Sequence, residues 1–136
     1  MTSALVRSCV TLRKCNAGNC DSDNGGIMEV RFVNSIHQID RQQWNLLCGD
    51  NYPFCRYEFL ATLEDAGCTT LAAGWQVTHL AVYEQQQLIA VMPGYIKEHS
   101  YGEYVFDWAW ADAYRRYGFN YYPKWINAIP FTPCAG

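Results

Sequence analysis

The stretch THLAVYEQQQLIAVMPGY, residues 78–95, restricts the fold of this 136-residue chain more than any other. Apolar and polar residues alternate from His79 to Glu84, as in a strand with one buried face. Three glutamines follow, and residues 88–92 are then expected to form a nearly continuous buried strand. Two such strands around a short polar turn predict an antiparallel β-hairpin. Pro93 cannot donate a backbone hydrogen bond, so it marks a bulge or a sheet edge.

The residues before the hairpin predict a strand and a short helix. The run MEVRFVNSI, residues 28–36, alternates and is rich in Val, Ile and Phe, which predicts a strand. A short helix is expected over residues 39–49, with Asp40 as its N-cap and Gly49 at its end. The residues of this helix expected to face the core are Trp44 and Leu47.

A second, longer helix is expected over residues 52–67, where Gly67 provides the stop. Its apolar positions recur at helical spacing and define one face. The residues of that face are Phe59, Leu60 and Leu63, with Cys55 one turn earlier.

Three further elements are expected after the hairpin. The segment SYGEYVFD, residues 100–107, predicts a strand, and WAWADAYRRYG, residues 108–118, predicts a helix that Gly118 closes. A last extended run covers residues 121–131. The order is β-α-α-β-β-β-α-β, a mixed α/β class without internal repeats. It is similar to the first two-thirds of the GNAT acyltransferase fold, which has a strand, two helices, a three-strand meander, a helix and a strand.

Residues 1–27 differ in composition from the rest of the chain. Three of the seven cysteines lie here, no acid precedes Asp21, and the run NAGNCDSDNGG consists of turn-forming residues. One interpretation is a flexible leader, such as an organellar transit peptide. The other is that translation begins at Met28 and that the upstream residues come from a mis-assigned start.

Composition excludes several classes of protein. The net charge of −3 does not favour a nucleic-acid binder, which needs a basic face. No apolar run approaches the ~20 residues that span a bilayer. The seven cysteines include no C-x-x-C pair and no zinc-type spacing with histidine, so we expect reduced thiols and no metal site. A cytoplasmic location follows, or an organellar one if residues 1–27 are a transit peptide.

Several blocks of sequence carry a family resemblance. They are PFCRYEFLATLEDAGC, GWQVTHLAVY, MPGYIKEHSYGEYVFDWAWADAYRRYGFNYYPKW and AIPFTPCAG. Over roughly residues 28–136 these blocks resemble the FemAB-like family of peptidoglycan biosynthesis or recognition proteins, predicted N-acyltransferases related to GNAT enzymes. Family members are longer and resemble tandem GNAT-like halves. The resemblance therefore implies the N-terminal half of such a protein, with a truncated C-terminus and little activity of its own.

The acyl-donor loop of a GNAT enzyme has no counterpart here. That loop, Q/R-x-x-G-x-G/A, precedes a helix whose N-terminus holds the pyrophosphate of acyl-CoA. Here Asp107 runs directly into the predicted helix without a glycine, and the near match at residues 115–120 is a helix stop. We therefore expect no cofactor in this half. The resemblance leaves acyl-CoA or aminoacyl-tRNA as donors for a full-length protein.

The acid-rich run EHSYGEYVFDWAWADAY, residues 98–114, contains the candidate catalytic residues. As a strand it would place Glu103 and Asp107 on one face about 13 Å apart, too far for direct proton exchange. The acids either line a cleft, where one acts as a base or binds an amine, or face solvent with Asp107 capping the next helix. The opposite face, Tyr104, Phe106 and Trp108, is expected to be core. The candidate catalytic residues are Glu103, Asp107 and His99.

Other residues are candidates for substrate binding, each with a simpler alternative. Lys97 and Lys124 could hold an anionic group or be solvated, and Tyr122 could stack on a sugar or a base or be core. Asp112 can form a helix surface pair with Arg115 or Arg116. No functional role is assigned to His37 or His79. The candidate substrate-binding residues are Tyr101, Lys97, Asp112, Tyr122 and Lys124.

Two functions remain open at this point. The first is half of an N-acyl or aminoacyl transferase acting on an amine, such as that of a peptidoglycan precursor. The second is a non-catalytic recognition module for a cell-wall precursor or peptide. The expected partners are a small-molecule or peptide acceptor and, in the first case, aminoacyl-tRNA. A truncated product without function is a weaker third interpretation.

Overall fold

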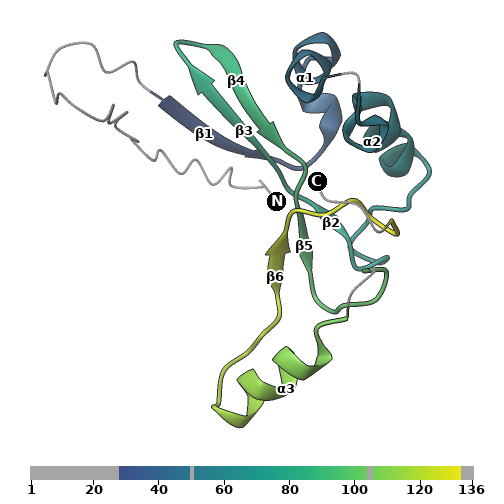
Figure 1. Ribbon diagram of the computed structural model, residues 1–136, viewed down its shortest axis with the longest axis vertical. Coiled ribbons are helices and arrows are strands. Elements are labelled where there is room, and N and C mark those ends of the chain that lie inside the picture. Colours follow the sequence, from purple (N-terminus) through teal and green to yellow (C-terminus); the bar gives the residue numbers. More distant parts are fainter. Residues whose placement is uncertain (1–27, 50, 104–105, 133–136) are drawn as a thin grey trace, which may run out of the picture.

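The computed structural model describes residues 28–49, 51–103 and 106–132 (Figure 1). The two interpretations of residues 1–27, and the expectations for Tyr104 and Val105, fall outside these ranges. Within them the chain forms two three-stranded antiparallel sheets and three α-helices, so the predicted mixed α/β class is confirmed. No helix in the described part of the chain has the length and apolar character to cross a bilayer.

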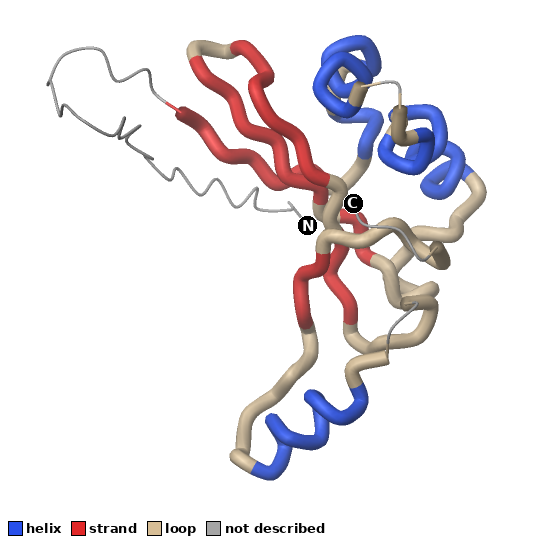
Figure 2. Tube along the Cα trace, in the orientation of Figure 1, coloured by secondary structure: helices blue, strands red, loops and turns tan. Residues whose placement is uncertain are grey.

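The first sheet contains β1 (Met28–Val33), β3 (His79–Glu84) and β4 (Gln87–Met92), in the order β1-β3-β4. Both pairings are antiparallel, and Figure 2 shows β3 and β4 as the predicted hairpin. Gln85 and Gln86 form its turn with positive φ angles of 49° and 69°. Two positive φ values in a two-residue loop match the right-handed twist of the strands.

The expectation that β4 is buried along its length is wrong. Leu88 is buried, but the next two residues, Ile89 and Ala90, are exposed. These two residues are exposed because β4 lies at the edge of its sheet, where only β3 pairs with it in the described chain. A central strand is covered on both sides, whereas an edge strand is not.

Four helical segments connect β1 to the second sheet. They are the 3₁₀ turns η1 (Ile36–Gln38) and η2 (Pro53–Cys55) and the helices α1 (Arg41–Cys48) and α2 (Tyr57–Asp65). Asp40 caps α1 as predicted by accepting a 2.9 Å hydrogen bond from Gln43 N–H. Gly49 and Gly67 follow their helices with φ of 70° and 72°, which confirms both stops.

The long helix expected over residues 52–67 is interrupted. Arg56 has an extended backbone (ψ 144°) between η2 and α2, so α2 begins only at Tyr57. Its first N–H group finds an acceptor outside the helix, because Asn45 Oδ1 of α1 accepts from Tyr57 N at 2.9 Å. The cap of α2 therefore comes from a neighbouring helix and not from its own sequence.

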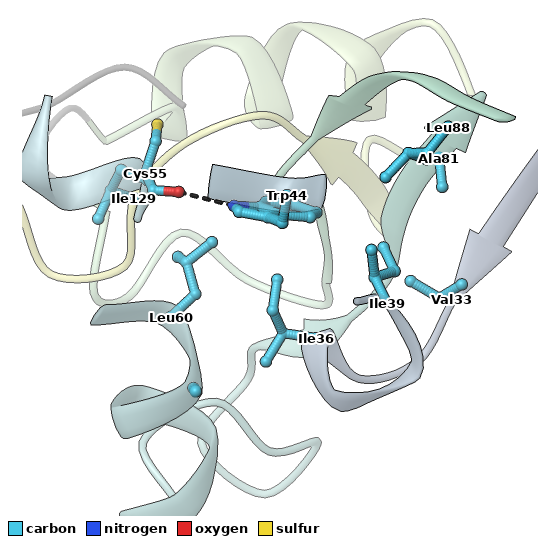
Figure 3. Close-up of a cluster of buried hydrophobic side chains, with 10 residues drawn as sticks. Val33, Ile36, Ile39, Trp44, Cys55, Leu60, Ala81, Leu88 and Ile129 are labelled. Carbon is cyan, nitrogen blue, oxygen red and sulfur yellow. Dashed lines mark hydrogen bonds between the residues drawn. The ribbon is translucent and has the colours of Figure 1, made fainter. Parts of the chain in front are cut away.

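The main core lies where η1, α1 and α2 meet the first sheet (Figure 3). Trp44 is fully buried at its centre, and its indole Nε1–H donates to the Cys55 carbonyl at 2.8 Å. Leu47, predicted to face this core, is instead substantially exposed. The buried members are Val33, Ile36, Ile39, Trp44, Cys55, Leu60, Ala61, Ala81, Leu88 and Ile129.

The second sheet has the order β2-β5-β6, with β2 at Gln76–Val77, β5 at Tyr95–Lys97 and β6 at Lys124–Ile126. The strand predicted over residues 100–107 is wrong, since its described residues lie in turns and loop. The strand that follows the hairpin is β5, which joins a different sheet, so the expected three-strand meander does not form. Gly102 turns the chain with a φ of 82°, which a continuing strand does not permit.

Helix α3 (Trp108–Arg116) forms as predicted and ends before Gly118, whose φ is 76°. Figure 1 shows it at the end of the molecule opposite the β3–β4 hairpin. None of its residues is buried, and Phe106 and Trp108 are 52% and 56% exposed. The prediction that these two rings belong to the core is therefore wrong, because it depended on strand alternation that the backbone does not adopt.

Candidate functional site

Lys124 of β6 forms ion pairs with both Glu103 and Asp107, the two acids expected from the sequence to lie about 13 Å apart. Its ammonium group lies 2.7 Å from Glu103 Oε2 and also forms an ion pair with Asp107 Oδ2. The side chains of Lys124, Glu103 and Asp107 are only 11%, 10% and 22% exposed. The expected separation of about 13 Å assumed an extended strand. The described residues of this segment form turns and loop instead of a strand, and both carboxylates pair with one cation. We call Lys124, Glu103 and Asp107 the lysine–carboxylate cluster.

Mutual stabilisation of charge dominates this cluster. Burial alone would lower the pKa of Lys124, but hydrogen bonds to Asp107 and Glu103 raise it above its ordinary value. Burial would raise the pKa of Asp107, and the hydrogen bonds from Lys124 and Tyr121 lower it instead. The lysine and Asp107 are therefore both charged at neutral pH.

Two tyrosines that precede β6 in the chain, Tyr121 and Tyr122, form hydrogen bonds at or near this cluster. Tyr121 donates its hydroxyl to Asp107 Oδ2 at 2.8 Å, and the Tyr122 hydroxyl lies 2.5 Å from Ser100 Oγ. The two rings are perpendicular, with centroids 5.1 Å apart. Asp107 occupies the N-cap position of α3 as predicted, but its side chain does not cap the helix. Its carboxylate is committed to Tyr121 and Lys124.

Lys97 of β5 is a second buried lysine and is not solvated. Its ammonium group lies 3.7 Å from the centroid of the Trp75 ring and donates to the Tyr101 carbonyl at 2.6 Å. Burial lowers the pKa of Lys97 to about 8; attraction to Glu103 works against this shift, and repulsion from Lys124 adds to it. Lys97 is therefore electrostatically coupled to the lysine–carboxylate cluster.

Two polar atoms next to these lysines have no hydrogen-bond partner in the described chain. They are Glu103 Oε1, an acceptor, and Trp75 Nε1, a donor. Gly102 lies directly against the indole, since a Cβ there would approach Trp75 Nε1 to 2.7 Å. A buried polar atom without a partner costs about 1–3 kcal/mol, so both atoms are candidate ligand contacts.

The remaining candidates lie outside the cluster's contacts. The His99 ring packs against Gly74 and Tyr101, and its Nδ1 accepts from Tyr101 N–H at 3.2 Å. Tyr101 exposes its ring to solvent. Asp112 forms an exposed pair with Arg115 at 3.3 Å on α3, one of the two surface pairings anticipated.

His79, to which no role was assigned, is the centre of a buried polar network. Its Nδ1 accepts from Gly94 N–H at 3.0 Å, so Nε2 carries the hydrogen that reaches Glu64 Oε1 at 3.2 Å. Glu64 also accepts from Ser35 Oγ and Ile36 N. Burial would raise the pKa of Glu64, but these hydrogen bonds lower it. No local spacing signals this network, because its members come from distant segments.

The burial of Lys97 predicts a specific dependence of stability on pH. Its pKa is about 8 in the folded chain and about 10.4 when unfolded. Between these values the unfolded state binds more protons, so Lys97 makes stability rise with pH. Denaturant unfolding of wild type and Lys97→Met across this window is expected to show wild type gaining on the order of 2 kcal/mol relative to the variant. If the free energy of unfolding changes equally with pH in both proteins, Lys97 does not have the lowered pKa. The tyrosines and Cys48 titrate in both proteins and so cannot cause a difference.

The fold and cluster define a mixed α/β protein with a buried lysine–carboxylate site. The FemAB-like family, described as peptidoglycan biosynthesis/recognition, matches residues 35–136. The chain therefore belongs to the FemAB-like family. No curated protein and no solved structure matched it. Within the described residues, no group of three or more His, Cys, Asp or Glu side chains is arranged to hold a metal ion.

Proposed function

We propose that this chain binds the acceptor amine in an N-acyl or aminoacyl transfer to a peptidoglycan precursor. The observation supporting it is the lysine–carboxylate cluster, where two carboxylates already surround one ammonium group. Glu103 keeps a buried second oxygen without a partner in the described chain. A carboxylate oxygen binds an ammonium group by a charge-assisted hydrogen bond, so Oε1 is the proposed contact for the acceptor.

The proposed chemistry gives each candidate residue a role. Glu103 receives the acceptor ammonium and takes one of its protons, and the neutral amine then attacks the donor carbonyl. An N–C bond forms while the donor's thioester or ester bond breaks, and the donor's sulfur or oxygen leaves as a thiol or alcohol by taking the second proton of the attacking amine. Asp107 positions Lys124, which forms an ion pair with the other oxygen of Glu103. Tyr101, Tyr122, Lys97 and Asp112 remain proposed contacts of the bound precursor, and His99 remains a proposed catalytic residue.

The donor is proposed to bind elsewhere. Helix α3 begins directly after Asp107, and the sequence has no glycine between Asp107 and Arg116. A GNAT-type pyrophosphate loop has no place in that segment. A GNAT-like ancestry with acyl-CoA or aminoacyl-tRNA as donor, and a cytoplasmic location, are parts of this proposal. The same missing loop favours a second candidate, a recognition module that binds the precursor without transfer.

The test uses a muropeptide with a free side-chain amine and the same muropeptide N-acetylated at that amine. Wild type is expected to bind the free amine about tenfold more tightly, because the charged contact at Glu103 is worth about 1.5–3 kcal/mol. Glu103→Gln is expected to remove this preference. Glu84→Gln, a carboxylate change on β3 outside the cluster, should keep it. Binding is measured by calorimetry.

Mass spectrometry then separates the two candidate functions. Incubation with acyl-CoA or aminoacyl-tRNA should yield an amide on the free amine if the chain supports transfer. Binding without product supports the recognition module. Equal affinity for the two muropeptides, or an unchanged preference in Glu103→Gln, would show that the cluster is not the acceptor site.

A further inference from the structure

A groove runs between β4 and the helical layer, away from the lysine–carboxylate cluster. It has a volume of about 350 Å³, within the usual range of ligand pockets. One wall is the continuous run from Ile89 to Pro93. The opposite side is formed mainly by Leu47, Cys48, Tyr52 and Asn127. None of its lining residues belongs to the cluster, so this surface is independent of the proposed function.

The lining of the groove shows that it follows the edge of the sheet. Successive side chains of a strand point to opposite faces, so a hollow over one face touches every second residue. This groove touches five residues in sequence, from Ile89 to Pro93. It therefore lies along the open side of β4, where backbone groups are accessible.

On that side of β4, the backbone groups have no strand partner among the described residues. β4 is the last strand in the order β1-β3-β4, and β3 is its pairing partner. In the described chain no other backbone group bonds to residues 87–92. Alternate residues of an antiparallel edge strand direct N–H and C=O groups outward, at a spacing that only another extended chain matches.

We infer that the groove binds an extended peptide with uncharged, apolar side chains at alternate positions, which pairs with β4 as an added strand. The backbone ladder provides affinity, and the groove accepts every second side chain. Within the part of the chain that the structure describes, no lining residue carries a charged side chain, so a charged side chain would lose its solvation there without a described partner.

A second copy of this chain fits the groove less well. α1 packs against β4, and its residues Leu47 and Cys48 line the groove together with Asn127 beyond β6. A whole sheet edge approaching β4 would meet these residues, whereas a single strand is narrower.

The thiol of Cys48 is a neutral part of the lining, because burial and the neighbouring Cys55 raise its pKa to about 11.

The probe is the capped hexapeptide acetyl-Thr-Val-Thr-Val-Thr-Val-amide, backed by a pool with Ala, Leu or Ser at each position. Two matched probes carry backbone N-methyl groups on all Val or on all Thr nitrogens. Only alternate N–H groups face β4, so one methylated set should bind about tenfold or more weakly and the other nearly normally. NMR hydrogen exchange should show slowed exchange in alternate amides of residues 87–92.

Two protein variants complete the test. Ile89→Lys places a charge in the groove and is expected to weaken peptide binding about tenfold or more. Leu71→Lys, a matched change at an exposed leucine outside the groove, should leave affinity within about twofold. The inference is overturned if no peptide of the pool binds at about 1 mM, if both methylated sets bind alike, or if the NMR changes fall outside β4. Self-association by sedimentation that Ile89→Lys abolishes would identify a second copy as the occupant and overturn it too.

Discussion

Replacing Trp44 by alanine is expected to lower the free energy of unfolding by about 4 kcal/mol. The indole is fully buried at the centre of the main core, so its removal leaves a cavity that the surrounding helices and sheet fill only in part. The Cys55 carbonyl also loses the 2.8 Å hydrogen bond from Nε1. Urea unfolding followed by far-ultraviolet circular dichroism measures the loss without relying on tryptophan fluorescence.

Two variants separate the causes of this loss. Leu46→Ala changes a residue of the same helix that is 83% exposed and is expected to cost less than about 0.5 kcal/mol. Trp44→Phe keeps much of the apolar contact but not the donor, so it should cost less than alanine and more than Leu46→Ala. A loss below about 1.5 kcal/mol for Trp44→Ala would mean that the ring does not support the core as described.

Replacing Lys124 by methionine is expected to cost roughly 3 kcal/mol at pH 7, because two largely buried carboxylates lose their shared counter-ion. The cost should depend on pH. Lys124 holds the pKa of Asp107 below its ordinary value, so that contribution is present above the unfolded pKa of about 4 and is lost as the pH falls through the folded pKa. The difference between wild type and variant should therefore shrink below pH 4.

Neutralising the carboxylates provides the internal control. In Lys124→Met/Glu103→Gln/Asp107→Asn the cluster itself carries no charge, so at least about half of the lost stability should return. Arg115→Met removes a cation from an exposed ion pair and should cost less than about 0.5 kcal/mol. A single-variant loss no larger than that of Arg115→Met would contradict the burial of the cluster's charges.

Several local features could be predicted because their causes lie within a few residues. Asp40 precedes the apolar spacing of α1, and a carboxylate there accepts from the N–H three residues on. The glutamine turn lies between two apolar runs of strand type, which leaves little alternative to a hairpin. Gly49, Gly67 and Gly118 follow helical spacing and adopt the positive φ that ends it.

The sequence predicts the individual residues of the candidate site but not that they lie in contact with one another. The sequence identifies Glu103, Asp107 and Lys124 as candidates, but it predicts the two acids to be too far apart for direct proton exchange. That judgement assumed a strand, because residues 100–107 combine β-branched and aromatic residues with apparent alternation. The positive φ at Gly102 ends the alternation of side chains expected for a strand. Lys97 and Ser100, which precede this turn in the chain, are buried. His79 had no signal, since its partners Glu64 and Gly94 are 15 residues away on either side.

By itself, the sequence determined the class of the fold, most element positions and the family, because periodicity, caps and turn residues act over short distances. Only the tertiary structure decided that the described strands divide into two sheets, that β4 pairs with β3 alone among the described strands, and that one lysine pairs with two carboxylates. These outcomes depend on which distant segments exclude water together. Burial and the pairing of charges are properties of that assembly, and no single stretch of residues specifies them.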